Sequence, residues 1–285
     1  MRRAFVLGIA CSFVAAALLA CFVTIDDGKI RHDGDDAATD GAASDGGIDA
    51  PLDGVPDGGC PSGMVKVPLD AGYYCVDATE ATLDEYGAFV DAAEPPAPGS
   101  QTAPCAWNTT FKPPGWGNGT VGSRPVGGLD WCDAYAYCKW SGKRLCGRIG
   151  GGALDPNGVT NAGEGQWFTA CTRNGARAYP YGATYEAGVC VGRDWMPMPQ
   201  GPQPVGKASM CIGGYDGIFD MSGNVEEFID SCLPDKLCDG GPECELCLEM
   251  GGGWGNRGAD MSCSYENQVL RKSQYDDNGV RCCWP

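Results

Sequence analysis

Apolar and polar positions divide the 285-residue chain into three stretches. Residues 4–20 form one apolar run directly after Arg2 and Arg3. Residues 22–59 show no apolar periodicity and are rich in Asp, Gly and Ala. After that, short apolar runs alternate with Gly- and Pro-rich turns. The pattern predicts a leader, a linker with too few apolar residues to form a core, and one globular domain over 60–285.

The globular domain is expected to begin with a β-hairpin. Apolar runs at 64–67 and 73–76 are separated by a turn that contains glycine, which is typical of two paired strands. Cys60 and Cys75 flank the hairpin, and we expect a disulfide bond between them.

Three helices follow from capping signals and helical spacing. Thr82 and Glu85 form a capping-box pattern ahead of apolar residues at helical spacing, which predicts a helix over 82–92. A second helix is predicted over 131–141, between an aspartate cap and a stop glycine. A third, short helix is predicted over 166–172.

The remaining chain is expected to be loop-dominated, with isolated short strands. Residues 231–248 contain four cysteines and are interpreted as a self-stapled insertion. These cysteines are Cys232, Cys238, Cys244 and Cys247. Two disulfide bonds are favoured there over a four-thiolate zinc site, since the chain is predicted to be exported.

The N-terminus has the features of a secretory leader. Its charged start, apolar run and small residue before Cys21 are typical of a signal peptide over residues 1–20. Leu18-Leu-Ala-Cys21 also resembles a bacterial lipobox, which predicts lipidation of Cys21. The alternatives are an uncleaved anchor helix or simple secretion. We expect the mature protein to be anchored to the cell envelope, at the outer membrane, by its lipid alone.

The linker is acidic. Residues 22–59 carry ten Asp against Lys29 and Arg31, a net charge of −8. We interpret residues 21–59 as a disordered tether. The whole chain has a net charge of −17, which disfavours nucleic acid and anionic membrane surfaces as partners.

The cysteine count indicates a disulfide framework. The chain has 18 cysteines, and 18 less Cys11 in the leader and the lipidated Cys21 leaves 16. An even number in an exported protein predicts up to eight bridges. Cys190 and Cys211 bracket a Pro-rich loop and are expected to pair. The vicinal Cys282-Cys283 are expected to bridge elsewhere, and no partner is assigned for Cys105, Cys132 or Cys146.

One stretch, Asp216–Phe228, has the chemistry of a cation site. Asp220 and Glu227 stand seven residues apart, around a Ser-Gly-Asn run that favours a turn. Two carboxylates and turn carbonyls facing one space would form an oxygen-lined site, the kind that calcium prefers. The alternative is an ordinary turn whose acids face solvent.

Six motifs in order resemble the formylglycine-generating enzyme, or sulfatase-modifying factor, family over about residues 60–285. They are Pro125-Val126, Asp130-Trp131 through Leu145, Tyr179-Pro-Tyr-Gly182, Phe219 through Phe228, Gly251-Gly-Gly-Trp254 and Gly279-Val-Arg-Cys282. The resemblance implies a loop-rich, disulfide-stabilised α+β fold, a variant of the C-type lectin-like fold.

The resemblance also implies site residues and further bridges. Calcium ligands are expected at Asp220 and Glu227 through side chains, and at Gly223 and Val225 through backbone carbonyls. Glu226 replaces a Trp that is common in relatives, and a second family calcium site near Gly188-Val189 lacks evident ligands. The implied disulfide bonds are Cys138–Cys282 and Cys171–Cys263.

The resemblance fails at the catalytic centre. Family enzymes hold copper(I) with two reduced cysteines, and those positions fall near Asn256 and Met261. Cys263 matches a disulfide position instead, so copper is not expected. The chain's single histidine, His32, lies in the tether, which excludes a histidine-based iron site or a Ser/His or Cys/His nucleophile in the domain.

These observations favour a monomeric, calcium-stabilised lipoprotein that works by binding a protein or glycan, with no catalytic residue assigned. Its recognition surface would include Trp195, Trp254 and Tyr265. The alternative is an oxidase that acts on protein cysteine.

Overall fold

The computed structural model describes residues 59–117, 122–236 and 241–285. The predicted signal peptide, the lipidation of Cys21, nearly all of the tether and its His32 lie outside the described residues. No helix in the described ranges is both long and apolar enough to cross a membrane.

The first sheet joins the two ends of the domain. It contains β1 (Met64–Pro68), β2 (Tyr73–Asp77), β3 (Arg144–Leu145) and β8 (Cys282–Trp284), in the order β1-β2-β8-β3. The predicted hairpin is confirmed as the antiparallel pair β1–β2. The C-terminal strand β8 lies between β2 and β3, so strands from the start and the end of the domain pair in one sheet.

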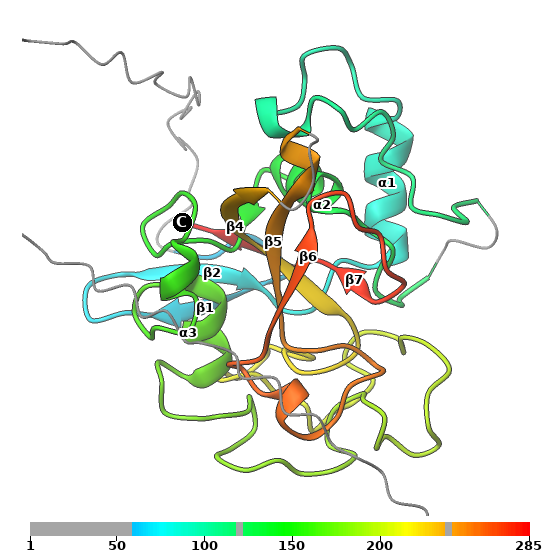
Figure 1. Cartoon of the computed structure of the whole chain (residues 1–285). Coiled ribbons are helices and arrows are strands. Elements are labelled where there is room, and N and C mark those ends of the chain that lie inside the picture. Colours follow the sequence, from blue (N-terminus) through cyan, green and yellow to red (C-terminus); the bar gives the residue numbers. More distant parts are fainter. Residues whose placement is uncertain (1–58, 118–121, 237–240) are drawn as a thin grey trace, which may run out of the picture. The chain divides into compact units, whose positions relative to one another are not determined.

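The second sheet contains β4 (Glu226–Lys236), β5 (Glu245–Met250), β6 (Glu266–Leu270) and β7 (Asn278–Gly279), in the order β6-β5-β4-β7. Figure 1 shows β5 and β6 side by side near its centre. The expectation of isolated strands in this part of the chain is wrong. Most of residues 231–248, interpreted as a self-stapled insertion, lies in the long β4–β5 hairpin, and the Cys232–Cys247 bond joins its two strands.

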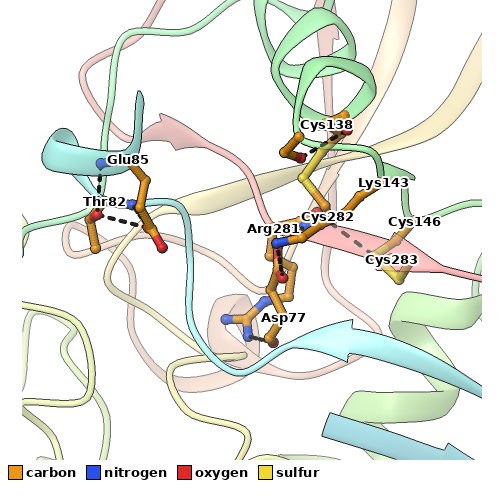
Figure 2. Close-up of polar contacts among 10 residues, drawn as sticks. Asp77, Thr82, Glu85, Cys138, Lys143, Cys146, Arg281, Cys282 and Cys283 are labelled. Carbon is orange, nitrogen blue, oxygen red and sulfur yellow. Dashed lines mark hydrogen bonds and ion pairs between the residues drawn. A yellow bond between two sulfur atoms is a disulfide. The ribbon is translucent and has the colours of Figure 1, made fainter. Parts of the chain in front are cut away.

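Three helices cover the sheets: α1 (Leu83–Ala93), α2 (Trp131–Trp140) and α3 (Gln166–Thr172). All three sequence predictions are confirmed to within one residue. The capping box of α1 forms as expected: the Thr82 backbone N–H donates to Glu85 Oε2 at 2.8 Å, and the Glu85 N–H donates to Thr82 Oγ1 at 3.2 Å (Figure 2). Asp130 caps α2 in the same way.

The core is apolar but contains buried charge. One cluster packs α1 against α2 through aromatic rings, including Tyr86, Phe89 and Tyr137. A second lies around α3 and the first sheet. Among the largest fully buried side chains is Arg281, which is 0% exposed.

Seven disulfide bonds join pairs of described cysteines. Four of them link the pairs named from the sequence, which are Cys60–Cys75, Cys138–Cys282, Cys171–Cys263 and Cys190–Cys211. The other three are Cys105–Cys132, Cys146–Cys283 and Cys232–Cys247. Cys244 is also disulfide-bonded. Because Cys232 and Cys247 are bonded to each other, the segment cannot supply the four thiolates that a zinc site of this type needs.

The vicinal Cys282 and Cys283 both bridge elsewhere, to Cys138 in α2 and to Cys146 after β3. These two bridges close loops with sequence separations of 144 and 137 residues. A loop of this length is worth about 5 kcal/mol in a chain-entropy estimate, before allowance for the other cross-links. A domain with this many bridges belongs in an oxidising compartment, extracellular or periplasmic.

Candidate functional site

The Asp216–Phe228 stretch forms a tight turn that leads directly into β4. Asp220, Gly223 and Asn224 all have positive φ, at 58°, 80° and 64°. A side chain at position 223 would clash with the backbone, since a Cβ there would lie 2.2 Å from the Val191 carbonyl oxygen. The Ser-Gly-Asn run therefore produces the predicted turn.

Glu227, the second residue of β4, forms a buried ion pair with Arg281. The Arg281 Nε and Nη2 atoms donate to the two carboxylate oxygens, each at 2.7 Å, and the side chains are 0% and 1% exposed. Trp167 Nε1 also donates to Glu227 Oε2, at 2.6 Å. Both oxygens of Glu227 thus accept hydrogen bonds, from Arg281, which precedes β8, and from Trp167 of α3.

Arg281 joins two further segments to this pair. Its guanidinium donates to the Asp77 carbonyl at 3.0 Å and to the Phe219 carbonyl at 2.8 Å (Figure 2 shows Arg281 beside Asp77). Burial opposes the charge on Arg281, but Glu227, helped by Glu80 and Asp220, raises the pKa of the guanidinium overall. Arg281 therefore stays charged in the core.

Two other carboxylates face this charge without enough hydrogen-bond donors. Asp220 Oδ2 accepts the Gly206 N–H at 2.5 Å, while its buried Oδ1 has no partner. Glu80 is 1% exposed, and neither of its oxygens has a partner. Burial raises the pKa of Asp220 to about 6 and raises the pKa of Glu80 well above its ordinary value, with Asp220 adding to the effect on Glu80.

The predicted calcium ligands fit a cation only in part. Asp220 retains a buried, unpartnered oxygen, which suits a cation. Glu227 is already neutralised by Arg281 and hydrogen-bonded at both oxygens, so it is poorly placed to serve as a second ligand. Across the described ranges, no group of three or more His, Cys, Asp or Glu side chains is arranged to hold a metal ion.

Calcium at this loop therefore stays a prediction. If calcium is bound there, EDTA should lower the melting temperature of the wild-type protein and leave an Asp220→Asn variant unchanged, because the variant lacks the available carboxylate. Thermal unfolding followed by circular dichroism measures both. An absence of any EDTA effect on the wild type would mean that Arg281 alone balances the charge.

A second pair of buried acids lies on the neighbouring strands. Asn267 Nδ2 donates to Glu226 at 2.7 Å and to Glu249 at 3.4 Å, and Glu249 is 0% exposed with an unpartnered Oε1. Burial raises the pKa of both carboxyls, and the negative charge of Asp277 raises each pKa further. Sequence reasoning noted Glu226 and missed Glu249. The available signal was a charged residue between Leu248 and Met250 in an apolar run.

Asn256 and Met261, near which the resemblance puts the family's copper ligands, both have structural roles. Asn256 Oδ1 accepts the Gly253 N–H at 3.0 Å, and the Asn256 carbonyl accepts the Arg193 N–H at 2.8 Å. Met261 is 1% exposed and packs in an apolar cluster that includes Tyr179. Every cysteine in the part of the chain that the structure describes is disulfide-bonded. The described residues thus supply no thiolate at this place.

The aromatic residues named from the sequence lie around the same positions. Trp195 and Trp254 are half-buried and pack against the cluster that contains Met261. Trp254 Nε1 is buried without a hydrogen-bond partner. Tyr265 lies close enough to Asn256 and Glu226 for both to influence its pKa, which burial raises. The structure therefore brings the three rings to the neighbourhood of Asn256 and Met261.

Comparisons with known proteins agree with this architecture. The family described as "Sulfatase-modifying factor enzyme 1-like domain" matches residues 64–285. No curated protein sequence matches the chain. Among solved structures, 49 chains match.

Three of these solved structures illustrate the degree of similarity. Treponema denticola variable protein 1 is 16% identical with a TM-score of 0.48, covering 78% of this chain and 91% of that one. PvdO from Pseudomonas aeruginosa is 17% identical with a TM-score of 0.49, covering 78% and 90%. CarF is 18% identical with a TM-score of 0.45, covering 76% and 88%.

Proposed function

Because the chain belongs to the sulfatase-modifying factor family, we propose that it is an exported member that has lost the copper chemistry and acts by binding a protein or glycan partner. Fold alone does not fix function, so the proposal depends on the residues at the site.

One observation carries the proposal. The resemblance puts the two reduced cysteines of family enzymes near Asn256 and Met261, neither of which is cysteine, and the nearby Cys263 is bonded to Cys171. A bis-thiolate copper(I) site needs two soft sulfur anions. A buried thioether and an amide that braces a backbone turn supply neither.

The surroundings of these positions support binding. Trp195, Trp254 and Tyr265 present large rings with polar tips, which suit protein and glycan recognition because they combine apolar area with hydrogen bonding. The Cys190–Cys211 and Cys171–Cys263 bridges restrain the loops that carry these rings, which lowers the entropy lost on binding.

The lipid anchor at Cys21 belongs to the same proposal. The lipobox-like leader and the acidic tether that follows it support a domain held away from the envelope surface. The mass of the mature N-terminal peptide tests this, since lipidation adds acyl chains to a chain that starts at Cys21.

Family membership itself favours the second candidate, an oxidase that acts on protein cysteine. Such an enzyme would need two free thiols close together in the fold. Alkylation of the denatured, unreduced protein, followed by peptide mass spectrometry, separates the two candidates. The binding proposal predicts no alkylated cysteine, because the mature cysteines are expected to be fully paired. Two alkylated cysteines that are neighbours in the fold would support the oxidase.

A further inference from the structure

A preformed pocket lies beside α1 and α2, away from the copper-ligand positions and built from other residues. Its volume is about 380 Å³. The walls come from Phe89 and Ala93 of α1, from Tyr135, Ala136 and Trp140 of α2, and from the loop that follows α1. Both helices are labelled at the upper right of Figure 1. The size falls at the low end of small-molecule sites and is too small for a helix or strand of a partner.

The loop over the pocket is held in place by covalent and polar contacts. Cys105, which lines the pocket, is bonded to Cys132 of α2. The Glu94 carboxylate accepts from the Thr110 hydroxyl at 2.8 Å and from the Phe111 N–H at 2.7 Å. The pocket therefore exists before any ligand arrives, and both carboxylate oxygens of Glu94 already accept hydrogen bonds within the protein.

Two buried polar atoms in the wall lack partners. They are Gln101 Oε1 and Thr102 Oγ1. The Gln101 amide is oriented by its own Nε2, which donates to the Asn108 carbonyl at 2.5 Å, so its oxygen is an available acceptor. A buried polar group without a hydrogen bond costs about 1–3 kcal/mol, and a ligand donor would remove that cost.

The rim of the pocket combines a cation with an exposed ring. Lys139 is exposed, lines the pocket and forms no ion pair with another described residue. Trp140 also lines it and is 45% exposed, although it is a large apolar side chain. The wall thus offers apolar surface, an acceptor and a positive charge.

We propose that this pocket binds a small anionic amphipathic molecule. Its apolar body packs against Phe89, Ala136 and Trp140, its N–H or O–H donates to Gln101 Oε1, and its anionic group faces Lys139. The proposal is independent of the recognition surface around Trp254, because the two sites share no residue.

Two dyes test the proposal. 1-Anilinonaphthalene-8-sulfonate has fused rings, an N–H donor and a sulfonate, and N-phenyl-1-naphthylamine lacks only the sulfonate. Fluorescence titration of the folded protein should show saturable binding of about one sulfonate dye per chain. An Ala136→Trp variant, whose indole fills the pocket, should weaken binding of both dyes by about tenfold or more, since the apolar contacts are lost. Ala88→Trp, on the exposed face of α1, is the matched control and should bind like the wild type.

Lys139→Gln tests the charge without filling the pocket. It should weaken binding of the sulfonate dye by about two- to fivefold, as expected for a partly exposed ion pair, and leave the neutral dye unchanged. Absence of saturable binding, or equal binding by wild type and a folded Ala136→Trp variant, would overturn the site. If Lys139→Gln affected both dyes equally or neither, the anionic class of ligand would be wrong.

Discussion

Replacing Arg281 by methionine should destabilise the domain by about 3–5 kcal/mol, a large part of the stability of a typical domain. Methionine keeps much of the apolar stem but has no charge, so the buried Glu227 would lose both of its bonds to the guanidinium. Glu80 and Asp220 would lose the cation they face. Three buried carboxylates would then have to ionise unpaired or take up protons.

Chemical denaturation of the purified variant measures this loss. Arg257→Met is the matched control, since Arg257 is exposed and its loss should change the free energy of unfolding by about 0.5 kcal/mol or less. A double variant, Arg281→Met with Glu227→Gln, should be less destabilised than the sum of the single changes, because it leaves no unpaired partner. An Arg281→Met variant as stable as the wild type would show that the ion pair does not hold the fold together.

The ion pair also shows the limit of sequence reasoning. The turn at Ser222-Gly223-Asn224 was predictable, because local residue preferences determine it. The partner of Glu227 was not, since Arg281 is 54 residues away and only the folded topology brings β4 close to the residue that precedes β8. The turn pattern and the family resemblance both predict Glu227 as a calcium ligand, whereas in the structure both of its oxygens accept from protein donors.

Local signals worked where the interactions are local. The capping boxes at Thr82 and Asp130 and the β1–β2 hairpin followed from residues within a few positions of one another. The β4–β5 hairpin was missed because register shifts interrupt β4 between Phe228 and Cys232 and again beyond it. Such bulges break the alternation of buried and exposed positions from which a strand is recognised.

Disulfide partners follow the same rule. Cys60 and Cys75 could be paired because they flank one hairpin, and Cys190 and Cys211 because they bracket one loop. Cys146 and Cys283 are 137 residues apart, and no local pattern connects them. Cys105 and Cys132 lie on either side of a long loop, so their bond depends on how that loop packs against α2.

The second prediction with a large expected effect is the absence of the family's copper-dependent activity. Incubated with copper(I), oxygen and a Cys-x-Pro-x-Arg peptide of the sulfatase type, the protein should form no formylglycine. The reason is chemical: the family's reaction needs two protein thiolates on copper, and neither Asn256 nor Met261, near which the resemblance puts them, is cysteine. An active family member that keeps both cysteines serves as the positive control and should convert the peptide under the same conditions.

The central claim is that this domain binds a partner and does not carry out the copper reaction. The mass of the peptide after this incubation tests that claim directly. Conversion of the cysteine thiol to the formylglycine aldehyde is read from that mass. The account predicts the unmodified peptide mass with this protein and the product mass with the positive control. Formation of formylglycine by this protein, above the level of copper alone, would contradict the account and make the chain a working oxidase.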